Sequence, residues 1–374
     1  MRQTIGRLSI YSPDTFGIAS ALYELGGMTV IHDASGCNST YTTHDEPRWY
    51  EMDSMVFISA ISEMEAVMGD DGKLIRDIIS AAGELHPKFI AIAGTPIPMM
   101  TGFDFKAVAA VIEKKTGIPT FGFATNGMED YLPGVSMALE AVAERLTLPA
   151  EEKVRGGVNL LGLTPLDFPL DAPEKIRALL EENGMKVLSS WAMGSTLDEI
   201  RDRSAKAEVN LILSYSGLAA AEKLKEKYGT PYVIGVPIGE FSKTVIRALM
   251  ESAEDGQNRN ALPGAAEESD TVVIGESVAA LSLAAALKKP VRVVCPFPDG
   301  HGIRDCGAVF APDEDSLVQA LTGAETVIAD PLFAPAFPEG AKLIRLPHTA
   351  YSGRLYDREM GADIEKIVQL LEKE

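Results

Sequence analysis

Cysteine is scarce in this chain, with three residues among 374: Cys37, Cys295 and Cys306. A small and odd number of thiols excludes a disulfide framework as the organising principle, and it favours a reducing compartment, the cytoplasm. An iron–sulfur cluster normally needs about four thiolates or substitutes, more than one chain can supply near Cys37. A cluster at Cys37 would therefore have to be shared with a second subunit.

The chain also has few basic residues relative to acidic ones, and it has no long apolar run. Lys and Arg number 34 against 54 Asp and Glu, giving a formal net charge of −20. This balance argues against nucleic acid or an anionic membrane surface as a partner, because both select basic patches. The longest apolar helix-like run, residues 278–287, is far shorter than a membrane span, and no apolar segment typical of a signal peptide follows Met1. We expect a cytoplasmic protein that binds neither nucleic acid nor membrane.

Several enzyme signatures are missing. No G-x-G-x-x-G follows a first strand, and there is no Walker A loop, C-x-x-C pair, HExxH or G-x-S-x-G elbow. The sequence therefore does not indicate Rossmann-type dinucleotide binding, ATP hydrolysis by a P-loop, or hydrolysis through a serine nucleophile elbow.

Short β-prone runs alternate with longer helical stretches, which is typical of parallel α/β architecture. This pattern occurs three times along the chain. It predicts three similar doubly wound, Rossmann-like domains at residues 1–150, 151–268 and 269–374, around a central cleft. The predicted strands are 29–33, 55–59, 88–93 and 120–123; 158–163, 186–190, 209–214 and 231–236; and 271–275, 291–295, 326–329 and 343–346. Helices are predicted at 15–25, 72–82, 105–115, 135–146, 174–183, 197–205, 218–228, 277–288, 316–321 and 364–372. The carboxylates within residues 62–65 stand at the start of a helix, where capping is a sufficient explanation for them.

Ligands in such folds bind beyond the carboxyl ends of the strands. Cys37 lies in one such loop, where Gly36 allows close backbone approach. It is a candidate nucleophile, a candidate metal ligand, or an inert thiol. His348 follows a strand, and both a position facing the cleft and a satisfied structural role fit it. His301 and Cys306 share a glycine-rich loop for which a solvated role fits better than metal binding.

Motifs in order along most of the chain resemble the nitrogenase component 1 type oxidoreductases. Residues 34–37 are similar to the family's Gly-Cys loop, which holds an iron–sulfur ligand, and residues 59–69, including Glu63, are similar to its S-x-x-[ST]-E-x-x-x-V-[FM]-G segment. Residues 87–95 resemble the strand that normally delivers a second cluster cysteine, with Thr95 in its place. The stretches 209–231 and 327–348 resemble the second-domain signature and the third domains of short members.

The departures from the family pattern limit what the resemblance implies. Family members commonly hold a cluster with three cysteines per subunit, and only Cys37 matches one of these. Ser214 falls about where the nitrogenase α subunit anchors its active-site metal cofactor through cysteine. The sequence therefore does not indicate a true nitrogenase; in length it is nearer the nickel-sirohydrochlorin reductive cyclase.

The resemblance implies two alternative functions. In the first, an ATP-dependent iron–sulfur reductase docks beside Cys37, and a [4Fe-4S] cluster shared in a homodimer, or with a sister subunit in a heterodimer or heterotetramer, passes electrons to a substrate. Gly36, Glu63 and Thr95 would neighbour the cluster. The expected substrate-pocket residues are Ser214, His301, His348 and Arg354. The alternative is a cluster-free carrier or scaffold that binds a metallocofactor or tetrapyrrole.

Overall fold

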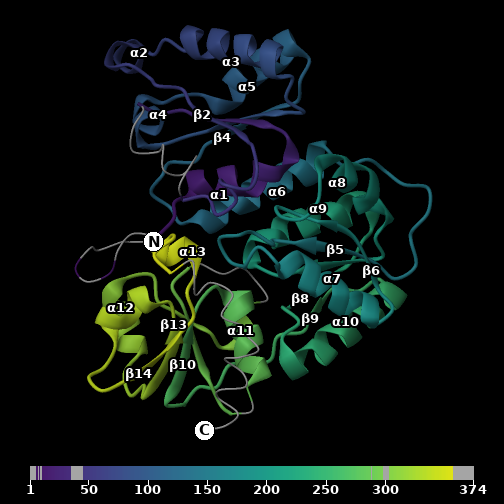
Figure 1. Cartoon of the computed structure of the whole chain (residues 1–374), viewed down its shortest axis with the longest axis vertical. Helices are drawn as coiled ribbons and strands as arrows, with labels where there is room; N and C mark the ends of the chain where they lie inside the picture. Colours follow the sequence, from purple (N-terminus) through teal and green to yellow (C-terminus); the bar gives the residue numbers. More distant parts are fainter. Residues whose placement is uncertain are drawn as a thin grey trace.

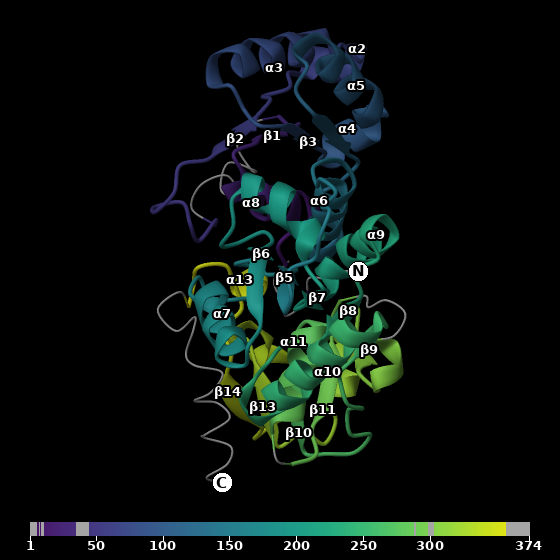
Figure 2. The same cartoon turned by 90° about the vertical axis from the view of Figure 1, so that its right-hand side faces the viewer.

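The computed structural model describes residues 6, 8, 11–34, 45–287, 289–297 and 303–356. Within them, three parallel β-sheets form with strand orders β2-β1-β3-β4, β6-β5-β7-β8-β9 and β12-β11-β10-β13-β14. Figure 1 shows the first sheet and its helices at one end of the molecule and the other two side by side below, and Figure 2 shows the same arrangement from the side. The predicted fold class, three doubly wound parallel-sheet units, is confirmed.

The first sheet is covered by helices on both faces. Ile90 and Ile92 of β3 pack against α3 and α5, whereas Ala91 and Ala93 face the core that contains α1 and α6. This alternation follows from the two-residue period of a strand, and burial of both faces explains the continuous apolar run. The strands are β1 (Met28–Ile31), β2 (Met55–Ile58), β3 (Ile90–Ala93) and β4 (Thr120–Phe123). The helices are α1 (Asp14–Leu22), η1 (Tyr23–Leu25), α2 (Glu63–Met68), α3 (Gly72–Leu85), α4 (Pro96–Thr101), α5 (Phe105–Thr116) and α6 (Tyr131–Arg145).

The second sheet has five strands, one more than the sequence pattern indicates. The addition is β9, two residues that pair with β8 inside the polar segment 254–270. The strands are β5 (Gly157–Leu161), β6 (Lys186–Ser190), β7 (Val209–Ile212), β8 (Tyr232–Ile234) and β9 (Arg259–Asn260). The helices are α7 (Ala172–Glu182), α8 (Leu197–Arg203), η3 (Ser204–Lys206), η4 (Tyr215–Gly217), α9 (Leu218–Tyr228), η5 (Gly239–Phe241) and α10 (Ser242–Asp255).

The third sheet also gains a two-residue edge strand, β12, beside β11. Its strands are β10 (Thr271–Ile274), β11 (Arg292–Cys295), β12 (Val309–Phe310), β13 (Thr326–Ala329) and β14 (Lys342–Arg345). The helices are α11 (Ser277–Ala286), η6 (Arg304–Cys306), α12 (Glu314–Ala320), η7 (Pro331–Ala336) and α13 (Thr349–Ser352). The C-terminal helix predicted at 364–372 lies outside the described residues.

Helix α6 joins the first unit to the second, because it packs against both α1 and α9. Asp130 caps its N-terminus by accepting a hydrogen bond from the Leu132 amide at 3.1 Å. Gly134 allows the close approach of α1, since a Cβ there would lie 1.9 Å from the Asp14 carbonyl oxygen. The start of α6 therefore holds Tyr131 at the junction with the other two units. Among the described residues, no helix is long and apolar enough to span a membrane.

Candidate functional site

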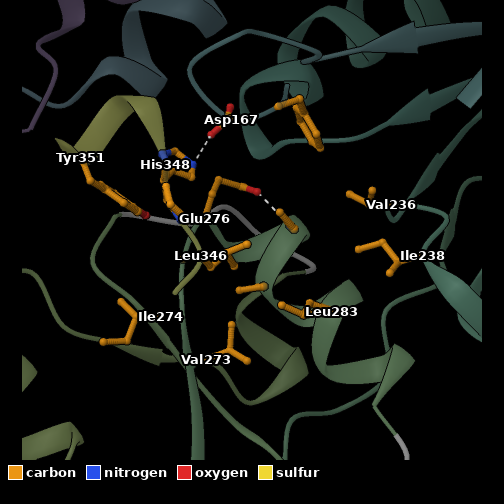
Figure 3. A pocket seen from close by; sticks show the side chains of 15 residues that line it. Asp167, Val236, Ile238, Val273, Ile274, Glu276, Leu283, Leu346, His348 and Tyr351 are labelled. Carbon is orange, nitrogen blue, oxygen red and sulfur yellow. Dashed lines mark hydrogen bonds and ion pairs between the residues drawn. The ribbon is translucent and has the colours of Figure 1, made fainter. Parts of the chain in front are cut away.

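A pocket of about 60 Å³ lies between the second and third sheets. Its wall is mostly apolar, with Val236, Ile238 and Leu283 on one side. Figure 3 shows the polar side chains of Asp167, Glu276 and His348 at one end. Loops after β5, β10 and β14 supply these three residues, so the pocket lies at the carboxyl ends of parallel strands, as such folds predict.

Asp167 connects all three units of the chain. Its carboxylate accepts a short hydrogen bond from the Tyr131 hydroxyl of α6 and another, at 3.2 Å, from the Thr164 hydroxyl. It also lies 3.1 Å from Nε2 of His348, and its side chain is fully buried. The hydroxyl of Tyr131 is held as a donor here, because burial and the nearby Asp167 raise its pKa well above the usual range.

His348 is oriented by contacts on several sides. Its backbone N–H donates to Asp330 at 2.7 Å, and its ring stacks on Tyr351 with centroids 4.2 Å apart. Because a carboxylate only accepts hydrogen bonds, the Asp167 contact places a hydrogen on Nε2, which leaves the lone pair of a neutral ring on Nδ1. Nδ1 is buried and has no hydrogen-bond partner among the described residues. The arrangement matches a histidine fixed by a carboxylate so that its other nitrogen can bind a ligand.

Glu276 is the second buried acid of the pocket, at 1% exposure. Its carboxylate accepts hydrogen bonds from the Tyr215 amide at 2.9 Å and the Ala279 amide at 3.0 Å. Burial, reinforced by the charge of Asp167, nevertheless raises the pKa of Glu276 to about 7. At neutral pH this side chain is therefore a proton donor as much as an acceptor.

The segment that contains Cys37 begins at a densely hydrogen-bonded strand end. Nδ1 of His32 lies 2.8 Å from the Ser59 hydroxyl, which also accepts from the Asp33 amide at 3.1 Å. The Thr95 hydroxyl donates to the His32 carbonyl at 3.0 Å. Thr95 is thus a buried structural contact next to the base of the loop. Gly36 and Cys37 themselves lie outside the described residues.

Arg48 anchors the chain beyond this loop. Its guanidinium is buried and binds Glu46, Glu24 and the carbonyl oxygens of Ser20 and Ala192. It therefore ties the segment after Cys37 to α1 and to the second unit of the fold. Neither Arg48 nor its partners were among the residues expected from the sequence.

Glu63 lies on the exposed first turn of α2. The neighbouring Ser62 and Glu65 form a reciprocal capping box, in which each side chain binds the other residue's backbone amide. The capping interpretation of this acidic segment is confirmed. Among the residues that the structure describes, no contact links Glu63 to a cluster site.

Of the expected substrate-pocket residues, His348 lines the pocket. Ser214 is buried at the end of β7 and accepts from the Ser216 hydroxyl at 3.1 Å; it does not line the pocket, although the next residue donates its amide to Glu276. Arg354 lies over the Tyr50 ring at 5.1 Å and is not among the residues that line this pocket. His301 lies outside the described residues, and Cys306 is buried, not in a solvated position as expected.

Sequence reasoning missed Tyr131, Asp167 and Glu276. Glu276 follows β10 by two residues, so an acidic residue directly after the first strand of a domain was a usable signal. Asp167 stands further from its strand, and Tyr131 contributes through a helix that the sequence predicts to begin at residue 135. Only the folded chain shows that these three meet.

Comparisons with known proteins place most of the chain in one family. The family model for nitrogenase component 1 type oxidoreductases matches residues 21–289. The structure is similar over 100% of its length to 94% of a chain in a solved structure titled "Nitrogenase Cp1 at pH 6.5", with a TM-score of 0.68 and 16% identity. At that identity the structural likeness shows the fold alone.

Curated relatives match part of the chain. The nitrogenase iron-molybdenum cofactor biosynthesis protein NifE of Clostridium pasteurianum is 28% identical over 184 residues, covering 47% of this chain and 38% of that protein. The nitrogenase molybdenum-iron protein alpha chain of Azospirillum brasilense is 28% identical over 199 residues, covering 49% and 39%. The aligned part thus spans about two fifths of the length of these relatives. Because the family model covers most of the chain, this protein belongs to the nitrogenase component 1 type oxidoreductase family.

Proposed function

We propose that this chain is the substrate-reducing component of a nitrogenase-like system. It receives low-potential electrons from an ATP-dependent iron–sulfur reductase through a cluster bound by Cys37, and it reduces a substrate in the pocket beside His348. The observation that carries the proposal is that the described residues on both sides of the Cys37 segment are anchored. The backbone of residues 32 and 33 is held by Thr95 and Ser59, and Arg48 on the other side is bound to the second unit. Such anchoring is what a loop needs if it must hold a ligand at a fixed place.

The cluster is proposed to be a [4Fe-4S] centre shared between subunits. Each chain offers one candidate thiolate, Cys37, because Cys295 and Cys306 are buried in the third unit of the fold. Two chains supply two thiolates, and Asp33, His44 or Asp45, or a cysteine-richer sister subunit, would complete the set. The assembly is therefore a homodimer, or a heterodimer or heterotetramer with a sister component 1 subunit.

An apolar surface beside the loop is the proposed docking site of the reductase. Helices α2 and α4 contact each other and follow the strands on either side of β1. Together they expose an apolar group that we call the methionine patch, consisting of Met64, Val67, Met68, Met99 and Met100. Their exposed fractions run from 55% to 86%, and methionine suits surfaces that adapt to a partner. Glu63 and Asp70, both exposed, flank the patch and favour a partner with basic groups.

Charging the methionine patch should weaken docking. Met100→Lys places a cation at the most exposed patch position, and we expect ATP-dependent capture of the proposed iron–sulfur reductase to fall about tenfold. The matched control is Met250→Lys on α10, which is 46% exposed on the second unit. Equal capture by both variants and the parent would remove the patch from the docking proposal.

His348 is the pocket residue proposed to contact the substrate, through its free Nδ1. Ser214 is proposed to shape the same wall indirectly, since the Tyr215 amide beside it holds Glu276. His301 and Arg354 stay proposed pocket residues from the sequence resemblance, and no described contact supports either one.

A second candidate function is a cluster-free carrier or scaffold for a metallocofactor or tetrapyrrole. Similarity to NifE of Clostridium pasteurianum, a protein named for cofactor biosynthesis, favours it. The replacement of a second cluster cysteine by Thr95 is a further argument. The iron content of the protein separates the two functions.

Substitution of Cys37 tests the proposed function. We expect Cys37→Ala, purified without oxygen, to hold about tenfold less iron and acid-labile sulfide than the parent. Cys306→Ser is the control, because Cys306 is buried and contacts Asn260 in a different part of the fold. Full retention of iron and sulfide in Cys37→Ala would show that Cys37 is not an essential ligand.

A further inference from the structure

We infer that the pocket takes a small uncharged molecule with an amide-like end, carrying a carbonyl or imine acceptor next to an N–H donor, and rejects anionic analogues. This inference rests on the proposed function and names the substrate class of the same site. Three features of the pocket support it: buried polar atoms without a hydrogen-bond partner, the charges of the lining side chains, and the pocket volume.

The polar end of the pocket has hydrogen-bonding capacity that the protein leaves unused. His348 Nδ1 and the Tyr351 hydroxyl are both buried, and neither has a partner among the described residues. Figure 3 shows the side chains of His348, Tyr351 and Glu276 at the same end of the pocket. Because an unmade hydrogen bond in a buried site costs free energy, these atoms are most simply explained as ligand contacts.

The chemistry of each atom defines the complementary ligand. Burial raises the pKa of Tyr351 well above its usual range, so its hydroxyl stays a donor. The neutral form of Glu276 is a second donor, whereas Nδ1 of His348 is an acceptor when Asp167 fixes the hydrogen on Nε2. The two hydrogen-bond donors, Tyr351 and neutral Glu276, suit a C=O or C=N acceptor on the ligand. The acceptor, Nδ1 of His348, suits an N–H donor on the same ligand.

The charges facing Glu276 explain the rejection of anions. The titratable groups around it are Asp167, His348, Tyr131 and Tyr351, and no Lys or Arg is among the described residues that line the pocket. The pocket lining holds two carboxyl groups and one imidazole, so acidic side chains outnumber basic ones. An anionic ligand would be desolvated without a counter-charge, which is strongly unfavourable.

The size of the pocket limits the ligand further. A cavity of about 60 Å³ has room for a few non-hydrogen atoms, well short of a tetrapyrrole. The apolar remainder of the wall, including Val236 and Leu283, suits a short hydrocarbon body. The inference thus favours a small unsaturated substrate over a tetrapyrrole.

Acetamide and acetate test this directly, because they have nearly the same shape and differ in charge. Saturation-transfer NMR at pH 7 on the purified full chain should show acetamide binding at least about tenfold more tightly than acetate. Tyr351→Phe, which removes an unpartnered hydroxyl and should fold normally, is expected to weaken acetamide binding several-fold. Tyr232→Phe on β8, outside the pocket, is the control that should leave it unchanged.

Acetate binding as tightly as acetamide, or no acetamide binding to correctly folded protein, would overturn the inference. So would equal acetamide binding by Tyr351→Phe and the parent. The measurement needs neither a cluster nor the reductase, so its failure is distinct from that of the proposed function, which the iron content decides.

Discussion

Replacing Arg48 by alanine is expected to lower the free energy of unfolding by about 3 to 5 kcal/mol, because it leaves buried acceptors without their cation. The Arg48 side chain is 3% exposed and its partner Glu46 is 0% exposed, with Nε and Oε1 2.6 Å apart. Further hydrogen bonds reach Glu24 at 2.9 Å and the Ala192 carbonyl at 2.9 Å. Chemical denaturation followed by circular dichroism measures the loss.

A surface arginine provides the comparison for Arg48. Arg259 pairs with Asp255 at 2.6 Å, but both side chains are substantially exposed, at 26% and 45%. Exposed pairs contribute little, so Arg259→Ala should lower the free energy of unfolding far less than Arg48→Ala. A similar small loss for Arg48→Ala would mean that the Arg48 network does not anchor the described residues that follow the Cys37 segment. Arg48→Lys keeps the charge and loses the forked geometry, so we expect an intermediate value.

Glu276→Gln should change how stability depends on pH. The folded pKa of Glu276, about 7, lies above its ordinary value of 4.5, so the folded state binds more protons than the unfolded state between these values. Its contribution to stability is therefore fully present below pH 4.5 and is lost as the pH rises through 7. Relative to the parent, Glu276→Gln should gain about 2 to 3 kcal/mol of unfolding free energy between pH 5 and pH 8.

The comparison isolates Glu276 from other buried acids. Burial also raises the pKa of Asp130, to about 6, and this group destabilises the parent and the variant alike as the pH rises. The difference between the two proteins therefore reports on Glu276. A difference that stays constant from pH 5 to pH 8 would show that Glu276 is ionised in the folded protein throughout.

The main strands and most of the longer helices could be predicted from sequence because they carry strong local signals. Predicted strands at 120–123, 186–190 and 326–329 coincide with β4, β6 and β13. The edge strands β9 and β12 have two residues each, too few for any period to show, and they form through pairing with a neighbour already in place.

The start of α6 shows where local rules mislead. The sequence pattern predicts a helix beginning at residue 135, after Pro133 and Gly134, yet the helix begins at Tyr131. Pro133 stands in the first turn, where its missing N–H costs nothing, and Gly134 is needed for the contact with α1. The four residues missed in this way include the one that brings the first unit to Asp167.

The candidate site was only partly predictable for a related reason. His348 could be selected because it follows a strand, and the structure places it in the pocket wall. Its partner Asp167 lies 181 positions away in the sequence, and nothing local to either residue records the contact. Pairings of this kind depend on how the three units pack, which a single sequence does not reveal.

Iron and acid-labile sulfide in the parent protein, purified without oxygen, test the central claim most directly. A [4Fe-4S] cluster shared by two copies predicts about two irons and two sulfides per chain, with broad charge-transfer absorption. Colourless protein without iron or sulfide, after attempted cluster reconstitution in the presence of any co-purifying sister subunit, would contradict the electron-transfer account and leave the carrier or scaffold function.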